Sequence, residues 1–223
     1  MTVEVAFRLL LVILTSYFMG SIPTAYLIAR YIRQINVFDV GSGNMGGTNV
    51  ARAMGLHWGI ITAALDALKG VGAILVAREI MPDYLLSASM VSAFAVISGH
   101  NWSFFATWLY TRYVGEFKIK GGKGAATALG TMFMMSPNAI PVILLLGIAI
   151  PIAIVTRYAS LAVLVGFSIG LGWIAGWAII NNNERLIYIP YAITTAVLIA
   201  WRFRENITRL LEGNERKIGN RVA

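Results

Sequence analysis

Residues 53–77 read AMGLHWGIITAALDALKGVGAILVA, and this stretch decides the class of fold. It is long enough to cross the hydrocarbon core of a bilayer, which takes about 20 apolar residues in a helix. Asp66 and Lys69 interrupt it three positions apart, so the two side chains share one face of the expected helix. Because charges at that depth are costly, we expect them either to serve function directly or to form an ion pair that orients a helix bundle.

The rest of the chain repeats this apolar pattern. Of its 223 residues, 58% are hydrophobic and 13% are charged, whereas about a quarter of a soluble domain is charged. We therefore predict an all-α, polytopic membrane protein with one transmembrane domain over residues 1–223 and about seven transmembrane helices. The expected helices cover residues 5–31, 53–77, 84–99, 124–136, 138–156, 159–180 and 186–202.

Positive charges are distributed unevenly between the loops. Fourteen Lys and Arg residues follow the first, third, fifth and seventh expected helices, against three on the other side, Arg8, Arg78 and Arg185. The positive-inside rule then places the N-terminus outside and the C-terminus in the cytoplasm. We expect a multi-pass protein of the cell membrane (inner or plasma membrane). We attribute the net charge of +8 to topology and acidic substrates, and expect no nucleic acid.

The C-terminal tail has a pattern of its own. Ile207, Leu210 and Leu211 recur at i, i+3 and i+4 among arginines, which predicts a short helix lying in the membrane interface. The same arginines are equally explained as a positive-inside anchor.

The first cytoplasmic loop is a glycine-rich turn with several groups that can bind an anion. These residues are Gly41, Ser42, Gly43, Asn44, Thr48, Asn49 and Arg52. Glycines let a backbone approach an anion closely, and arginine can grip phosphate with two N–H groups. A nucleotide P-loop does not fit, because Gly47 stands at its lysine position and a membrane helix precedes the loop. The alternative is a glycine turn with a helix cap.

A second glycine-rich loop precedes the fourth expected helix on the same side. It reads Gly121-Gly122-Lys123-Gly124. A run of backbone N–H groups at a helix N-terminus attracts anions, and a lysine there can hold phosphate as a point charge. Lys123 is also explained as one more topogenic cation. Two such loops fit either two phosphorylated substrates or one pyrophosphate.

Histidines are few in this chain. His100 ends the third expected helix, where it could act as a general base, donate to a phosphate or simply bond a backbone carbonyl. His57 lies beside Trp58, and we interpret it as an interfacial residue. With two histidines and no cysteine, thiolate chemistry and cysteine metal sites are excluded, and we expect no metal and no cofactor.

These segments together resemble the bacterial acyl-phosphate-dependent glycerol-3-phosphate acyltransferases, integral membrane enzymes that make lysophosphatidic acid. The matching segments follow the family order along nearly the whole chain. They are GSIPTAYLIAR at 20–30, GSGNMGGTNVARAMG at 41–55, LDALKG at 65–70, SGH at 98–100, KGGKGAATALG at 120–130, RYASLA at 157–162 and RENITRLLEGNE at 204–215.

The resemblance implies a set of site residues. Ser42, Arg52 and Asn206 would act at the active centre, with Lys123 on phosphate and His100 as an alternative base to the substrate's own phosphate. The implied substrate-binding residues are Gly41, Gly43, Asn44, Thr48, Asn49, Gly121, Gly122, Gly124, Thr127 and Arg204. The implied partners are acyl phosphate, glycerol 3-phosphate and membrane lipid, and the oligomeric state stays open.

The chain departs from the family pattern at a few positions. Phe203 stands where members usually carry histidine, and Ser103 lies in the stretch where proline is usual. Gly47 replaces a common alanine.

Three alternative functions stay open. An acyl-CoA-dependent acyltransferase of the HxxxxD type would need aspartate five residues after histidine, where this chain has Thr62 and Phe105. A membrane transporter or binding protein for an organic phosphate is supported by Asp66 and Lys69. A non-catalytic scaffold would leave both glycine loops unexplained.

Overall fold

The computed structural model describes residues 2–181 and 186–218, and helices dominate these ranges. Within them the one strand-like pairing is an antiparallel bridge between Ser103 and Lys120. The chain divides into two compact units, one holding the described residues up to Met134 and the other those from Met135 onward. The all-α fold class is confirmed. Arg185, Arg221 and Ala223, which enter the topology prediction, lie outside the described residues.

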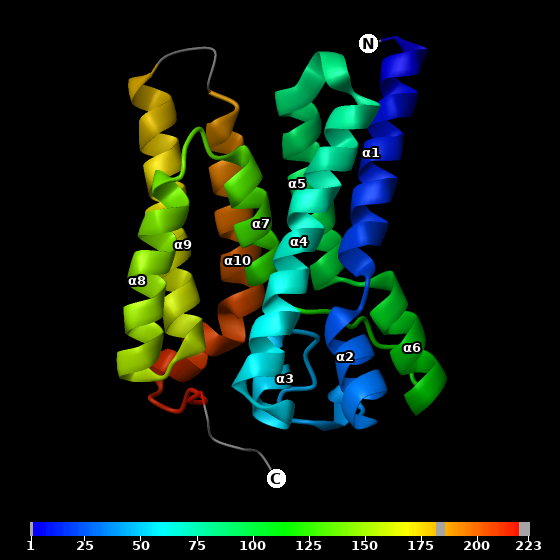
Figure 1. The fold of residues 1–223 in the computed structure, drawn as a ribbon, viewed down its shortest axis with the longest axis vertical. Coiled ribbons are helices and arrows are strands. Elements are labelled where there is room, and N and C mark those ends of the chain that lie inside the picture. Colours follow the sequence, from blue (N-terminus) through cyan, green and yellow to red (C-terminus); the bar gives the residue numbers. More distant parts are fainter. Residues whose placement is uncertain (1, 182–185, 219–223) are drawn as a thin grey trace. The chain divides into compact units, whose positions relative to one another are not determined.

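The first unit contains seven α-helices among its described residues, drawn in blue to green in Figure 1. They are α1 (Val3–Ser21), α2 (Thr24–Arg33), α3 (Gly47–Met54), α4 (Leu56–Ile80), α5 (Leu85–Asn101), α6 (Phe104–Val114) and α7 (Ala125–Met135). Short 3₁₀ turns cover Val37–Asp39 and Pro82–Tyr84. The helices α1, α4 and α5 pack against one another, and α3 packs against α4.

The single helix predicted over residues 5–31 is wrong, because the chain breaks between α1 and α2. Pro23 follows Ile22 at the break, and proline lacks a backbone N–H donor and clashes with the preceding turn of a helix. The Ile22 N–H closes α1 by donating to the carbonyl of Met19 at 3.3 Å. The break leaves the last carbonyls of α1 open to side chains from other helices.

Glycines set the close packing inside the first unit. A Cβ on Gly20 or Gly99 would lie 2.1 Å from a backbone oxygen of the facing helix, where α1 meets α5. A Cβ on Gly70 or Gly130 would lie 2.3 or 2.0 Å from a backbone oxygen, where α4 meets α7. Small residues at such crossings are typical of helices that pack within a membrane, because van der Waals contact replaces the hydrophobic drive there.

Two helices of the first unit were not predicted from the sequence. The helix α3 begins at Gly47, inside the stretch expected to be a loop. The helix α6 begins after Ser103, whose hydroxyl accepts from the Ala106 N–H at 3.0 Å, and it ends at Gly115 with a φ of 85°. Both are short, with 8 and 11 residues, and lie outside the long apolar runs from which the helices were predicted.

The second unit contains α8 (Ile140–Thr156), α9 (Ala159–Ile180) and α10 (Tyr188–Leu211) among its described residues. The helix α9 packs against both α8 and α10 (Figure 1). The predicted helices agree with these bounds except at the C-terminal end of α10. There the separate interfacial helix predicted at Ile207, Leu210 and Leu211 is wrong, because α10 continues without a break to Leu211.

Three helical segments in the described residues are long and apolar enough to cross a membrane. They are Val3–Arg33, which includes the break, Leu56–Ile80 and Ala159–Ile180. The helices α7 and α8 are also apolar but shorter. The prediction of about seven transmembrane helices stays a prediction.

Candidate active site

The first glycine loop is held in place by Asn49. Gly41 and Gly43 have φ angles of 61° and 64°, which favour glycine. The buried Asn49 side chain accepts from the Ser42 N–H at 3.0 Å and from the Ser42 hydroxyl at 3.3 Å, and its Nδ2 donates to the Val40 carbonyl at 3.0 Å. The amide of Asn49 therefore fixes the turn and the position of Ser42.

The other predicted residues of this loop reach its surface to different degrees. Gly41 and Thr48 are exposed, whereas Asn44 and Arg52 are half-buried. The helix α3 begins directly after Gly46, which provides no side-chain cap. A helix N-terminus without a side-chain cap presents backbone N–H groups that can bind an anion.

The second glycine loop packs tightly on the C-terminal end of α5. A Cβ on Gly121 would lie 2.3 Å from the backbone oxygen of Asn101, and a Cβ on Gly122 would lie 2.0 Å from His100 Nε2. Gly124 has a φ of 75°, and α7 begins at the next residue. Close packing is therefore one reason for glycine at these positions. Lys123, which lies between them, is half-buried.

The structure brings the two glycine loops together. The Met45 N–H donates to the Gly121 carbonyl at 3.3 Å, and a Cβ on Gly122 would lie 2.6 Å from the Met45 oxygen. The Gly122 N–H donates to the His100 carbonyl at 2.9 Å. Segments far apart in the sequence thus meet at Met45, Gly121 and Gly122, with His100 at the contact.

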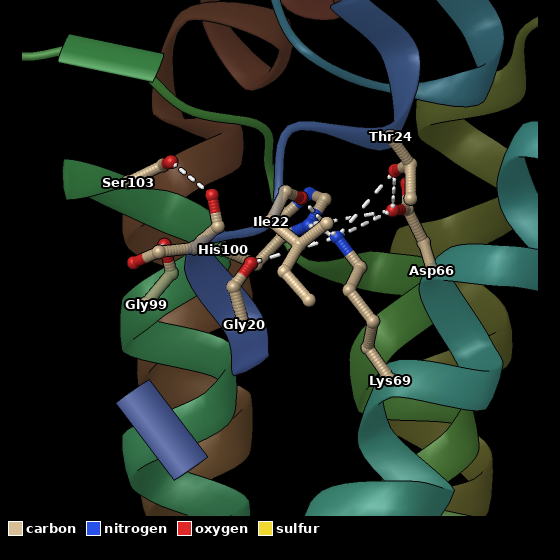
Figure 2. A network of polar contacts seen from close by, with 9 residues as sticks. Gly20, Ile22, Thr24, Asp66, Lys69, Gly99, His100 and Ser103 are labelled. Carbon is tan, nitrogen blue, oxygen red and sulfur yellow. Dashed lines mark hydrogen bonds and ion pairs between the residues drawn. The ribbon is translucent and has the colours of Figure 1, made fainter. Parts of the chain in front are cut away.

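A buried polar network lies against these loops (Figure 2). Lys69 Nζ lies 2.8 Å from Asp66 Oδ1 and donates to the Ile22 carbonyl at 2.8 Å. The Thr24 hydroxyl donates to the same Asp66 oxygen. The ion pair, one of the two possibilities that the sequence left open, therefore ties α4 to the break between α1 and α2. His100 Nδ1 lies 3.5 Å from Lys69 Nζ and so joins this network.

A small pocket opens beside the network, between the α1–α2 break, the first glycine loop and the α5–α6 connection. Its lining residues are Gly20, Ile22, Pro23, Thr24, Met45, His100, Ser103 and Ala106. Ser103 also anchors the second loop, because its N–H donates to the Lys120 carbonyl at 2.9 Å. Its hydroxyl donates to the Ser21 carbonyl, at the end of α1, at 2.6 Å. A proline at position 103 could not make the first of these bonds.

Two buried polar side chains near the second loop have no hydrogen-bond partner in the described part of the chain. They are the amide of Asn101 and the hydroxyl of Thr127. A Cβ on Gly124 would lie 2.6 Å from Asn101 Oδ1, so this amide faces the start of α7. Thr127 was predicted to bind substrate. Asn101 was not singled out, although its place next to His100 was a signal.

Lys120, one of the predicted cytoplasmic cations, packs against aromatic rings. Its Nζ lies 4.0 Å from the centre of the Tyr110 ring. Burial lowers the pKa of Lys120, and the nearby charge of Lys118 lowers it further. Lys120 therefore fixes the start of the second loop as well as adding charge.

In the second unit, Asn206 belongs to a cluster around Glu215. Asn206 Nδ2 donates to Glu215 Oε1 at 2.7 Å, the Ser160 hydroxyl donates to the same oxygen at 3.0 Å, and Arg209 Nε donates to Oε2 at 2.8 Å. Burial raises the pKa of Glu215, but these three hydrogen bonds and the charge of Arg209 outweigh burial and hold that pKa below its ordinary value. Neither Glu215 nor Ser160 was predicted to have a role, although both lie in the matched segments.

The remaining predicted residues of α10 have separate surroundings. The exposed Arg204 donates to the Trp201 carbonyl at 3.0 Å and stacks 5.1 Å from the centre of the Trp201 ring. Phe203 and Asn206 lie three residues apart and are both buried, so they share one face of α10. Among the described residues no group of three or more His, Asp or Glu side chains could hold a metal ion.

The chain matches the family model for glycerol-3-phosphate acyltransferase over residues 10–213. It is 35% identical over 212 residues to glycerol-3-phosphate acyltransferase 2 of Moorella thermoacetica, covering 95% of this chain and 98% of that relative. It is 33% identical over 219 residues to the glycerol-3-phosphate acyltransferase of Clostridioides difficile, covering 96% and 98% of the two chains.

Two solved structures of PlsY (YgiH), an integral membrane glycerol 3-phosphate acyltransferase, have the same fold. The glycerol 3-phosphate form aligns with a TM-score of 0.77 and 31% identity over 95% of this chain and 96% of the other. The lysophosphatidic acid form aligns with a TM-score of 0.73 over 95% of each chain. The predicted membrane protein is confirmed. Since the family model matches most of the chain and full-length relatives exceed 30% identity, this chain belongs to the glycerol-3-phosphate acyltransferase family.

Proposed function

We propose that this protein transfers an acyl group from acyl phosphate to the 1-hydroxyl of glycerol 3-phosphate, releasing lysophosphatidic acid and phosphate. The observation that carries this proposal is the contact between the two glycine loops, through the Met45 N–H and the Gly121 carbonyl. Each loop leads into a helix N-terminus, at α3 and α7. Two adjacent anion sites suit a reaction in which each substrate brings one phosphate.

The reaction needs positioning more than a strong protein base. The 1-hydroxyl oxygen attacks the acyl carbonyl carbon, and the bond from that carbon to the phosphate oxygen breaks. The hydroxyl proton passes to an oxygen of the leaving phosphate, which departs as hydrogen phosphate. Fixed donors around the developing oxyanion and aligned substrates would supply most of the rate.

Three residues of the first unit carry this proposal. Ser42 is held by Asn49 at the turn of the first loop, where its hydroxyl can orient a substrate oxygen. Arg52, half-buried in the last turn of α3, suits a two-pronged grip on phosphate. Lys123, half-buried between glycines, provides a compact positive charge.

Other residues are proposed to take part in the reaction. Asn206, whose amide donates to Glu215 within the second unit, is proposed as a catalytic residue. The proposed substrate-binding residues are Gly41, Gly43, Asn44, Thr48, Asn49, Gly121, Gly122, Gly124, Thr127 and Arg204. Since the Asn49 amide is occupied by the loop, we expect it to act on substrate through Ser42.

We further propose the placement of the protein in its membrane. The apolar runs favour one transmembrane domain of about seven helices in the cell membrane, and the loop charges favour an N-terminus outside and a C-terminus in the cytoplasm. Both glycine loops would then face cytoplasmic glycerol 3-phosphate, while the lipid tail of the donor stays in the bilayer.

Mass balance tests the proposed reaction. The purified protein in lipid–detergent micelles receives palmitoyl phosphate and radiolabelled glycerol 3-phosphate. We expect lysophosphatidic acid and inorganic phosphate in equal amounts. Phosphate release without lysophosphatidic acid would mean hydrolysis, and neither product from a folded protein would reject the proposal.

One observation favours transport of an organic phosphate as a second candidate. The broken α1–α2 segment, with a buried Asp66–Lys69 pair at the break, resembles the discontinuous helices that line transporter sites. Sealed proteoliposomes without acyl donor distinguish the two functions. Uptake of labelled glycerol 3-phosphate above that of protein-free vesicles would support transport, whereas we expect no uptake.

A further inference from the structure

His100 belongs to a buried triad with Lys69 and Asp66 (Figure 2). Lys69 Nζ lies 2.8 Å from Asp66 Oδ1 and 3.5 Å from His100 Nδ1. Asp66 Oδ1 lies 3.8 Å from the same His100 nitrogen, which is beyond hydrogen-bond distance. All three side chains are at most 8% exposed, so the protonation states of the three groups depend strongly on one another.

The ammonium group of Lys69 sets the proton on the imidazole. An ammonium carries only donors, so each atom that it contacts must accept. Asp66 and the Ile22 carbonyl, both at 2.8 Å, are such acceptors, and the Gly20 carbonyl and the Thr24 hydroxyl lie 3.5 Å away. His100 Nδ1 can accept only through a lone pair, which places the ring proton on Nε2. A charged imidazolium would direct its Nδ1–H at an ammonium group, and Asp66 Oδ1 already accepts from Lys69 and Thr24.

The other imidazole nitrogen faces the second glycine loop. A Cβ on Gly122 would lie 2.0 Å from His100 Nε2, so the ring packs directly on the Gly122 backbone. The Gly122 N–H also donates to the His100 carbonyl at 2.9 Å. The loop is therefore in contact with both the backbone and the ring of this one residue.

We infer that His100 is a neutral positioning residue, held in its Nε2–H form by Lys69, and that it orders the Gly121–Gly124 loop instead of removing the substrate proton. The nitrogen that could accept a proton is covered by Lys69, and the nitrogen that faces the loop already carries one. Asp66 is the counter-charge of Lys69 inside the protein, at 2.8 Å. The proton of the 1-hydroxyl then goes to the leaving phosphate, as in the proposed reaction, on which the activity tests below rest.

Nitrogen NMR tests the tautomer directly and independently of the proposed reaction. The chain has two histidines, and His57 is exposed, so His57→Gln leaves His100 as the single imidazole. Protein labelled with ¹⁵N-histidine, at neutral pH in micelles, should show one neutral ring protonated at Nε2. An imidazolium pattern, or a ring protonated at Nδ1, would overturn the inference. Lys69→Met in the same background should change the pattern, and an unchanged spectrum in a folded variant would mean that Lys69 does not set the tautomer.

Two conservative substitutions separate positioning from base catalysis. The amide nitrogen of glutamine can replace Nε2–H, whereas that of asparagine replaces Nδ1. We expect His100→Gln to lose less than about tenfold in kcat/KM, and His100→Asn and His100→Ala to lose about 100-fold, the scale of misplaced substrate-binding groups. The loss should appear mainly in the KM of a phosphate-bearing substrate.

Base catalysis by His100 would give a different pattern of activity in these variants. If His100→Gln is as inactive as His100→Ala in folded protein, with kcat reduced and KM unchanged, then His100 is a base and the inference is wrong. If the wild-type protein makes no lysophosphatidic acid, the proposed function fails, and the NMR spectrum still decides the tautomer. His57→Gln, outside the network, is the activity control.

Discussion

Asn49 shows that a residue type that suits a ligand can also hold a loop in place. Its amide was predicted to bind substrate, yet Asn49 Oδ1 accepts from Ser42 and Nδ2 donates to the Val40 carbonyl. The residue types of the site could be predicted from the sequence, because amides, glycines and cations just before a helix indicate an anion-binding turn from the local sequence alone. Which of them point inward could not, since that depends on the exact path of the turn between Gly41 and Gly43.

A substitution at Lys123 tests whether this residue contacts phosphate or only adds a positive charge that sets the membrane topology. If Lys123 holds phosphate, Lys123→Ala should cost about 2–4 kcal/mol in transition-state stabilisation, measured as kcat/KM in purified protein. Lys118→Ala is the matched control, because Lys118 lies in the same loop, carries the same charge and is exposed. Equal activity in the two variants would mean that Lys123 makes no phosphate contact and contributes only its positive charge to the membrane topology.

Arg52 can be tested by the shape of its charged group. Arg52→Ala should lose about as much as Lys123→Ala, and Arg52→Lys should recover only part of it, because an ammonium cannot make the paired contacts of a guanidinium. The readout is again kcat/KM with palmitoyl phosphate and glycerol 3-phosphate. Full recovery in Arg52→Lys would show that charge alone matters at this position.

Glu215 makes the second unit sensitive to acid. Its pKa is lowered in the folded protein, so the cluster stabilises the fold above the ordinary glutamate pKa and loses this contribution as pH falls through the lowered value. Thermal unfolding of the wild type should therefore occur at a lower temperature near pH 4 than near pH 7. Glu215→Gln should already be less stable at neutral pH and should respond less to acid.

Glu205 offers the control for this experiment. It is an exposed glutamate on α10, and Glu205→Gln should unfold like the wild type at both pH values. If Glu215→Gln also unfolds like the wild type at neutral pH, the hydrogen bonds of the Glu215 cluster do not stabilise the unit.

At the scale of elements, the break between α1 and α2 is the main departure from prediction. Pro23 was a local signal for the break, but apolar residues continue on both sides of it and led to the prediction of one long helix. The break is stable because a buried cation from another helix, Lys69, binds the Ile22 carbonyl at 2.8 Å. Such long-range compensation cannot be predicted from a local window.

Gly47 tests the packing of α3 on α4. A Cβ on Gly47 would lie 2.5 Å from the Gly59 backbone oxygen, so the alanine that is usual in the family does not fit here without a shift of α3. We expect Gly47→Ala to destabilise the protein by about 1–3 kcal/mol, the usual cost of overpacking. The measurement is unfolding by heat or denaturant, together with kcat/KM, because α3 carries Arg52.

The neighbouring glycine provides the control for α3. Gly46 has an extended φ of −153°, and a Cβ added there would meet no atom within 4 Å, so Gly46→Ala should cost less than Gly47→Ala, at most about 1 kcal/mol for alanine at the N-cap of α3. If Gly46→Ala and Gly47→Ala are equally stable, the contact between α3 and α4 accommodates the added methyl group, and the predicted overpacking at Gly47 is wrong.

At the scale of the whole molecule, the sequence was sufficient for the class of fold, the family and the order of most helices. Hydrophobic runs and loop charges are local features, and the matched segments extend along nearly the whole chain. The meeting of the two glycine loops was not predictable, because the contact between Met45 and Gly121 joins residues that are distant in the sequence. The Glu215 cluster was missed because it too joins residues that are distant in the sequence, Ser160 and Asn206 among them.

The charge distribution predicts the orientation in the membrane. Fourteen cations against three place the C-terminus in the cytoplasm, so a reporter fused after Ala223 should be active only when it is a cytoplasmic reporter. A matched fusion with a reporter that works only outside should be silent. Activity of the outside reporter would reverse the orientation and move both glycine loops to the outer face.

The choice of acyl donor tests the proposed reaction most directly. Purified protein receives glycerol 3-phosphate with equal concentrations of palmitoyl phosphate, palmitoyl-CoA or palmitoyl acyl-carrier protein, and the initial rate of lysophosphatidic acid formation is measured. We predict product from palmitoyl phosphate, because the site offers two adjacent phosphate-binding loops and lacks the HxxxxD pattern at Thr62 and Phe105. A rate with palmitoyl-CoA equal to or above that with palmitoyl phosphate would contradict the proposed donor.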